Sequence, residues 1–150
     1  FHYARAFGGG GIFTGADDLT FLDGWYEAAT AELVRGIGVV GTNDLGSPRV
    51  VAGDHSTHSL VTREYMSQYG TIDEPGKIYH EGYIHDFVDD ELIETAKYRG
   101  MFAMALKSHV RHDHPNWYRS VPMDDLYAQQ QRRILLGRPI YRQRRRLWAG

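Results

Sequence analysis

The chain has no cysteine among its 150 residues, so disulfide bonds, thiolate metal sites, iron–sulfur ligation and cysteine nucleophiles are all excluded. Long hydrophobic runs are also missing. The best apolar stretch, Gly100 to Leu106, has seven residues, whereas a membrane-spanning helix needs about 18 to 20. A serine nucleophile on a sharp turn is not indicated either, because the sequence has no G-x-S-x-G element. We therefore expect no transmembrane segment and no covalent catalysis of these kinds.

Strongly periodic segments are scarce, and 17 glycines interrupt the chain. The apolar fraction of 42 % is still enough for one modest core. We expect a mainly α fold: a small helical domain with long irregular N- and C-terminal arms and at most a short strand pair. The expected organisation is an extended glycine-rich arm over residues 1–15, a helical body over 16–137 and an arginine-rich tail over 138–150.

The clearest helical pattern runs from about Asp90 to Val110. Acidic residues open it at Asp89 and basic residues close it at Lys107, which matches the polarity of the helix dipole. Its central stretch, residues 100–106, is apolar all round, and such a turn needs contacts on more than one side. The protein interface expected from this helix consists of Met101, Phe102, Met104 and Leu106.

Charge is distributed very unevenly along the chain. Residues up to Glu94 include sixteen acids and five bases, whereas residues 95–150 include three acids and twelve bases. No acid follows Asp125, so the basic end must be neutralised by a partner or by the acidic body itself. Arginine donates two parallel hydrogen bonds to phosphates and carboxylates, and neighbouring aromatic rings add apolar contact. The residues expected to bind a partner or anionic lipid are Arg132, Arg133, Arg138, Arg142, Arg144, Arg145, Arg146, Tyr141 and Trp148.

Four targets suit this arginine segment: an acidic protein surface, anionic lipid headgroups such as cardiolipin, RNA, and the chain's own acidic body. An acidic protein surface is preferred. Nucleic acid is disfavoured, because the isoelectric point of about 6.5 reflects an acidic body that would repel a polyanion.

Two patterns that resemble cofactor sites are better explained by local structure. The segment Gly36 to Gly41 matches the dinucleotide pattern G-x-G-x-x-G, but a helix is expected before it where a strand is required. We therefore expect a helix cap and a packed loop there. The acid pairs beginning at Asp17, Asp89 and Asp124 stand where helices are expected to start, so capping is the preferred explanation for them as well.

Eight histidines suggest a metal site, but no group of them has clear ligand spacing. His80 and His85 would diverge by roughly 140° on a helix, because they are five residues apart. A better cluster is formed by His109, His112 and His114, although capping of a helix C-terminus is the preferred explanation. The weaker pair is His55 and His58. We expect no catalytic, cofactor-binding or metal-binding residue, and no cofactor.

The preferred function is a non-catalytic accessory or structural subunit of a large multiprotein complex, docking through its arms and its basic C-terminal segment. The first residue is Phe1 and not Met, which is typical of a processed organellar protein or a fragment. The expected complex is therefore a mitochondrial respiratory-chain or ATP synthase assembly, with the chain peripheral to the inner membrane and bound to other protein subunits. Two alternatives are an RNA-associated subunit of an organellar ribosome and a small His-dependent metalloprotein.

Overall fold

The computed structural model describes residues 3–7, 10–123 and 125–150, and it has a mixed α/β fold with 21 % strand and 32 % helix. The expectation of a mainly α fold is therefore wrong. Six strands form one sheet in the order β1-β2-β5-β4-β6-β3, which is far more than a short strand pair. Most of these strands are five residues or shorter. Such short apolar segments give little local signal, because their pairing depends on residues far away in the sequence.

Most neighbouring strands of the sheet run antiparallel, and β4 and β6 run parallel. Five strands curl into a nearly closed, barrel-like sheet, and β3 pairs with the end of β6. The curl brings Phe13 of β2 against Phe21 of β3, with ring centroids 5.4 Å apart. The strands are β1 (Tyr3–Phe7), β2 (Gly11–Gly15), β3 (Leu19–Phe21), β4 (Val39–Asn43), β5 (Ser59–Thr62) and β6 (Phe102–His112).

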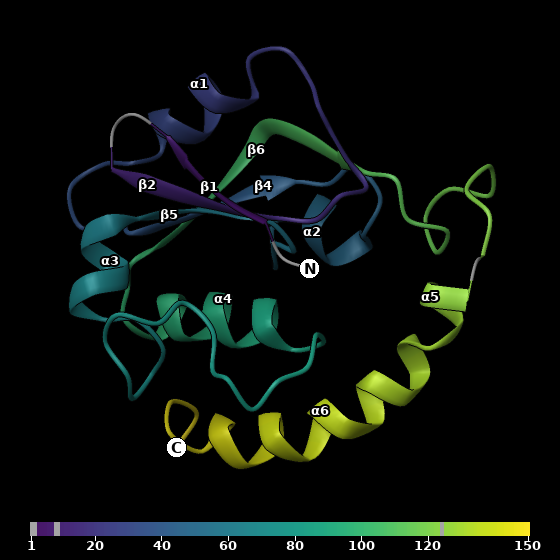
Figure 1. Cartoon of the computed structure of the whole chain (residues 1–150). Helices are drawn as coiled ribbons and strands as arrows, with labels where there is room; N and C mark the ends of the chain where they lie inside the picture. The colour runs from purple at the N-terminus through teal and green to yellow at the C-terminus, as the bar shows by residue number, and fades with distance from the viewer. Residues whose placement is uncertain (1–2, 8–9, 124) are drawn as a thin grey trace.

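Helices cover both faces of the sheet. Figure 1 shows α1 on one face, α4 on the opposite face, and α6 outside α4, so that α4 lies between the sheet and α6. Among the described residues, no helix combines the length and apolar character needed to cross a membrane. The helices are α1 (Trp25–Ala31), α2 (Pro48–Val51), α3 (Arg63–Gln68), α4 (Val88–Tyr98), α5 (Asp125–Ala128) and α6 (Gln130–Arg145).

The long helix expected over residues 90–110 is in fact a helix followed by a strand. Its acidic first turn is present in α4, but α4 ends at Tyr98. Gly100 then adopts a φ of 68°, a conformation that favours glycine, and the chain reverses into β6. In β6, Phe102 and Ala103 pair with Val39 and Val40 of β4. The apolar stretch 100–106 therefore reflects a strand inside the sheet and not a helix turn that needs an external partner.

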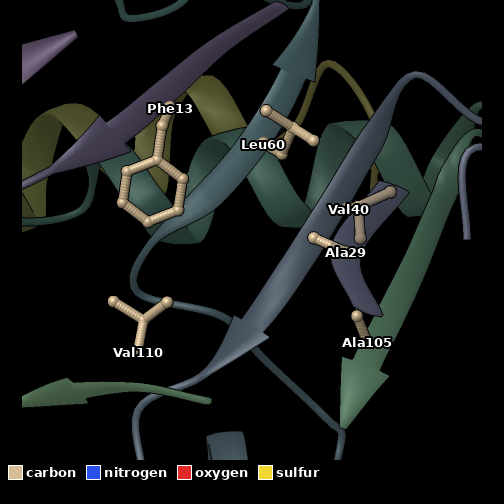
Figure 2. Packing of buried hydrophobic residues seen from close by; sticks show 6 residues of the cluster. All are labelled: Phe13, Ala29, Val40, Leu60, Ala105 and Val110. Carbon is tan, nitrogen blue, oxygen red and sulfur yellow. The ribbon is translucent and has the colours of Figure 1, made fainter. Parts of the chain in front are cut away.

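Two apolar clusters fill the two sides of the sheet. Val40 and Leu60 face α1, while their neighbours Val39 and Val61 face α4, as expected where side chains alternate along strands. Figure 2 shows the first cluster, which comprises Phe13, Ala29, Val40, Leu60, Ala105 and Val110. The second comprises Val39, Val61, Tyr65, Leu92, Ile93 and Ala96.

The glycines of the G-x-G-x-x-G segment are required by this packing. A Cβ atom on Gly38 would lie 2.6 Å from the ring of Tyr65, and one on Gly41 would lie 2.5 Å from Cβ of Ser56. The segment also leads into β4 and not into a helix. Close packing therefore accounts for these glycines without a nucleotide.

The segments expected as arms contain regular structure. Strands β1 and β2 occupy most of the first fifteen residues and belong to the sheet, while Gly8 and Gly9 lie outside the described residues. The expected tail from residue 138 continues α6, which contains Pro139.

Candidate functional site

A pocket of about 600 Å³ is lined by the turn between β2 and β3, the chain before β5 and α4, the end of β6, and helices α5 and α6. This volume is within the range that holds small ligands. Its polar lining is rich in histidine. The chemically versatile side chains in it include Asp18, His58, His85, His112, His114 and Tyr127.

The sheet positions two of these histidines from strands on either side of β4. His58 directly precedes β5, and its carbonyl oxygen accepts hydrogen bonds from Ser56 Oγ at 2.6 Å and Thr42 Oγ1 at 2.8 Å. His112 ends β6, and its N–H donates to the carbonyl of Asp44 at 3.2 Å. Both imidazoles therefore project from backbone that is fixed to β4 or the loop after it.

A polar contact in the pocket joins His112 to Asp18. His112 Nε2 lies 3.1 Å from Asp18 Oδ2, and the hydroxyl of Tyr127 donates to the same oxygen at 2.8 Å. Burial alone would raise the pKa of Asp18, but the hydrogen bonds from His112 and Tyr127 outweigh it and hold the pKa well below 3.8. Asp18 is therefore a stable carboxylate that orients the imidazole.

This contact selects the tautomer that His112 adopts when its ring is neutral. If Nε2–H donates to the carboxylate, Nδ1 holds the lone pair of the neutral ring. His112 Nδ1 and Asp18 Oδ1 are both buried and have no hydrogen-bond partner among the residues described. Buried acceptors in native proteins are normally satisfied, so two without donors in one site indicate a place for a ligand, a cation or water.

Two further imidazoles lie against His112. Ring centroids are 4.8 Å apart for His58 and His112, and 5.1 Å apart for His112 and His114. His114 Nδ1 accepts a hydrogen bond from the Asn116 N–H at 3.1 Å, which leaves the proton of the neutral ring on Nε2. Burial and the neighbouring His112 lower the pKa of His114. When both rings are neutral, His114 therefore offers a donor at Nε2, and His112 offers an acceptor at Nδ1.

A second histidine contact lies at the start of α4. His55 Nε2 is 3.1 Å from Asp89 Oδ2, and His55 Nδ1 is 4.0 Å from Asp90 Oδ1. Within the described ranges, these three residues form the one group whose ligand atoms all lie within 4.8 Å of one another. Arg49 Nη1 already lies 3.0 Å from Asp90 Oδ1. A positive charge is therefore present at this group, which serves as an ion-pair cluster at the N-terminus of α4.

The carboxyls of this cluster titrate differently. Burial alone would raise the pKa of Asp89, but the hydrogen bond from His55 outweighs it and lowers that pKa. Burial and the neighbouring Asp89 charge raise the pKa of Asp90. The different directions follow from the direct hydrogen bond that Asp89 receives from His55.

The structure brings together histidines that the sequence placed in three separate groups. His58, His85, His112 and His114 all line the pocket, whereas His80 and His109 do not belong to its lining. His112 and His114 are two residues apart, a spacing that places side chains on the same side of an extended chain. This spacing was missed because the segment was expected to be the end of a helix.

Asp89 and Asp90 are in the first turn of α4, where acids were expected, but the N-cap residue is Phe87 and no side chain caps the helix, and both acids also line the pocket.

The predicted partner-binding arginines lie on different sides of α6. Arg144, Tyr141 and Trp148 face α4, where all three contact acidic side chains. Arg145 Nε lies 3.5 Å from Glu94 Oε2, and Arg133 lines the pocket. The exposed members are Arg132, Arg138, Arg142, Arg145 and Arg146, and of these Arg138 also lines the pocket. Binding of a partner by this set stays a prediction.

The predicted interface residues belong to the sheet or its approach. Met101 and Phe102 pack against the second apolar cluster, and Met104 lies in β6. Leu106 is 46 % exposed. Their role as an interface also stays a prediction, although the helix from which it was inferred is not present.

Comparison with known proteins adds no family or function: no protein-family model, no curated protein and no solved structure matches the chain.

Proposed function

We propose that the chain is a small His-dependent metalloprotein that binds one divalent transition-metal ion in the pocket. The observation that supports this most strongly is the state of His112. Its Nε2 is held by the Asp18 carboxylate, and its Nδ1, an acceptor in the neutral ring, is buried without a hydrogen-bond partner among the described residues. Histidines that bind metals commonly donate their other ring N–H to a carboxylate, which fixes the tautomer and orients the ring.

The spacing of the neighbouring rings supports the same proposal. With metal–nitrogen distances of about 2.0–2.1 Å, two imidazoles on one tetrahedral ion have ring centroids roughly 5 Å apart. The separations of 4.8 Å and 5.1 Å around His112 are compatible with this arrangement. The ligand atoms of His58, His112 and His114 do not all lie within 4.8 Å of one another, however, so these side chains must move closer together to bind an ion. We therefore assign His112 and His58 as the principal ligands. A set of imidazoles without thiolates suits zinc, copper, nickel or iron.

His114 is the weaker ligand in this proposal. Its Nδ1 accepts the Asn116 N–H, so the ring has no free lone pair in this tautomer. Coordination by His114 requires that hydrogen bond to break, and Asn116 is exposed enough for water to replace it. The order of importance is thus His112 and His58 first, then His114.

Zinc titration by calorimetry, with matched variants, tests the proposal. We expect one site per chain, and His112→Ala or His58→Ala should weaken binding about a hundredfold or more. Asp18→Asn removes the orienting carboxylate and should cost about 10–100-fold. His109→Ala and His80→Ala are the controls, because they remove histidines outside the pocket lining. Circular dichroism checks that each variant is folded.

Two outcomes would contradict the proposal. One is an absence of stoichiometric zinc binding, or equal losses in the control variants. The other is loss of binding in His55→Ala with retention in both His112→Ala and Asp18→Asn, which would place the ion at the cluster of His55, Asp89 and Asp90.

An accessory-subunit role is compatible with this site and stays a separate proposal. The exposed arginines Arg132, Arg142 and Arg146 favour it, since they offer a charged surface outside the pocket lining. Its test is native co-purification followed by mass spectrometry. Recovery of the chain without stoichiometric protein partners would count against it.

A further inference from the structure

Helix α6 has two faces with different chemistry. On the inner face, Arg144 binds Glu91 and Asp73, while Tyr141 and Trp148 donate to Glu94. Through these contacts, Glu91 and Glu94 of α4 and Asp73 of the loop before it receive hydrogen bonds from α6 and its end. The inner face therefore docks α6 on the chain's own acidic body, as Figure 1 shows from the position of α6 outside α4.

The outer face combines cations with exposed leucines. Four arginines of this helix and its end are exposed and form no ion pair within the described part of the chain: Arg132, Arg138, Arg142 and Arg146. At about 100° per residue, Arg132, Arg142 and Arg146 lie within roughly 80° of one another around the helix axis. By the same spacing Leu135 and Leu136 lie on this side of the helix, 67 % and 59 % exposed, and Leu147, 51 % exposed, follows the end of α6.

We infer that this outer face of α6 binds the surface of an anionic lipid membrane. No acidic residue follows Asp125 in the sequence, so nothing on the helix itself neutralises these arginines. A helix with exposed leucines among arginines can insert its apolar side chains between headgroups while the guanidinium groups pair with lipid phosphates. This inference is independent of the proposed metal site.

The composition of the face favours lipid over RNA. Sequence-tolerant binding of single-stranded nucleic acid depends on aromatic rings that stack on bases. The rings of α6 and its end that could do so, Tyr141 and Trp148, are turned inward, and Trp148 is only 7 % exposed. Exposed leucines form no hydrogen bond or ion pair with a base or phosphate, but their transfer into the membrane interface lowers the free energy.

Flotation with lipid vesicles tests the inference. Vesicles of phosphatidylcholine that contain anionic phosphatidylglycerol are compared with vesicles of pure phosphatidylcholine. The wild-type chain should float with the anionic vesicles only. The triple variant R132E/R142E/R146E should bind about a hundredfold more weakly, because each arginine near an anionic surface contributes several-fold.

The matched control is R35E/R63E/R119E, which makes the same change in net charge at exposed arginines outside α6. It should retain most of the binding. Leu135→Ser with Leu136→Ser should leave a weaker association that high salt abolishes, because only the electrostatic part would remain.

Three results would overturn the inference. Equal losses in the two triple variants would show that net charge, and not the α6 face, governs binding. Equal flotation with neutral vesicles would exclude recognition of anionic lipid. A single-stranded RNA oligonucleotide that displaces the chain from vesicles and binds it more tightly than they do would assign the face to nucleic acid.

Discussion

Asp73 and Arg144 show how a single exposed carboxylate can report on the docking of the C-terminal helix. Arg144 donates to Asp73 Oδ1 at 2.6 Å and to Oδ2 at 3.1 Å, a two-point contact. The hydrogen bond from Arg144 is the main reason that the pKa of Asp73 lies below 3.8. Because the Asp73 side chain is 45 % exposed, the contribution of this pair to stability is reduced by solvent.

The lowered pKa makes the stability of the fold sensitive to acid. The unfolded chain binds a proton at Asp73 before the folded chain does, so the contribution is present above about pH 4 and is lost as the pH falls further. We expect the urea midpoint of the wild type to drop between pH 5 and roughly pH 2.5 by more than that of Asp73→Asn. Parallel titrations of both proteins measure this. Identical slopes would contradict the ion pair.

At the scale of elements, the docking of α6 on α4 depends on a buried ion pair. Glu91 of α4 accepts three hydrogen bonds from Arg144 at 2.7–3.1 Å, and the hydroxyl of Tyr83 donates to Glu91 Oε2 at 2.8 Å. The side chains of Glu91 and Arg144 are only 4 % and 8 % exposed. Burial and the carboxylate of Glu91 raise the pKa of Tyr83, so its hydroxyl remains a donor. Removing one partner of such a buried pair is strongly destabilising, because the other charge is left buried and unpaired.

Arg144→Leu should therefore destabilise the chain by about 3–5 kcal/mol, because it leaves Glu91 charged, buried and without its cation. Arg142→Leu is the control on the exposed side of the same helix, and it should change stability by about 0.5 kcal/mol or less. Urea unfolding measures both. The double variant Glu91→Leu with Arg144→Leu should recover part of the loss. Equal effects of Arg144→Leu and Arg142→Leu would contradict the role of the pair.

The sequence predicted elements whose signals are local. The acidic first turn of α4, beginning at Asp89, is where the match to the helix dipole placed it. The prediction from sequence was wrong for β6. The apolar run from Phe102 to Leu106 suits a strand as well as a buried helix, and only its pairing with β4 decides between the two. The apolar pattern therefore predicted one long helix where the chain in fact reverses direction at Gly100.

At the scale of the whole molecule, the candidate site is a product of the fold. Asp18, His58 and His112 come from three segments that are 40 or more residues apart in the sequence. Their meeting depends on β5 and β6 lying on either side of β4 and on the turn after β2 reaching the end of β6. The sequence could identify histidine-rich segments, but it could not assign them to one pocket. The same limit applies to α6, whose inner and outer arginines are indistinguishable without the position of α4.

The central claim, a metal ion held by His112 and its neighbouring imidazoles, is tested most directly by X-ray absorption spectroscopy of the zinc-loaded chain. The fine structure reports the ligand atoms, their distances and the number of imidazole rings around the ion. The proposal predicts at least two imidazole nitrogens at about 2.0–2.1 Å, with loss of that signature in His112→Ala. A shell of oxygen ligands alone, or an unchanged spectrum in His112→Ala, would contradict it.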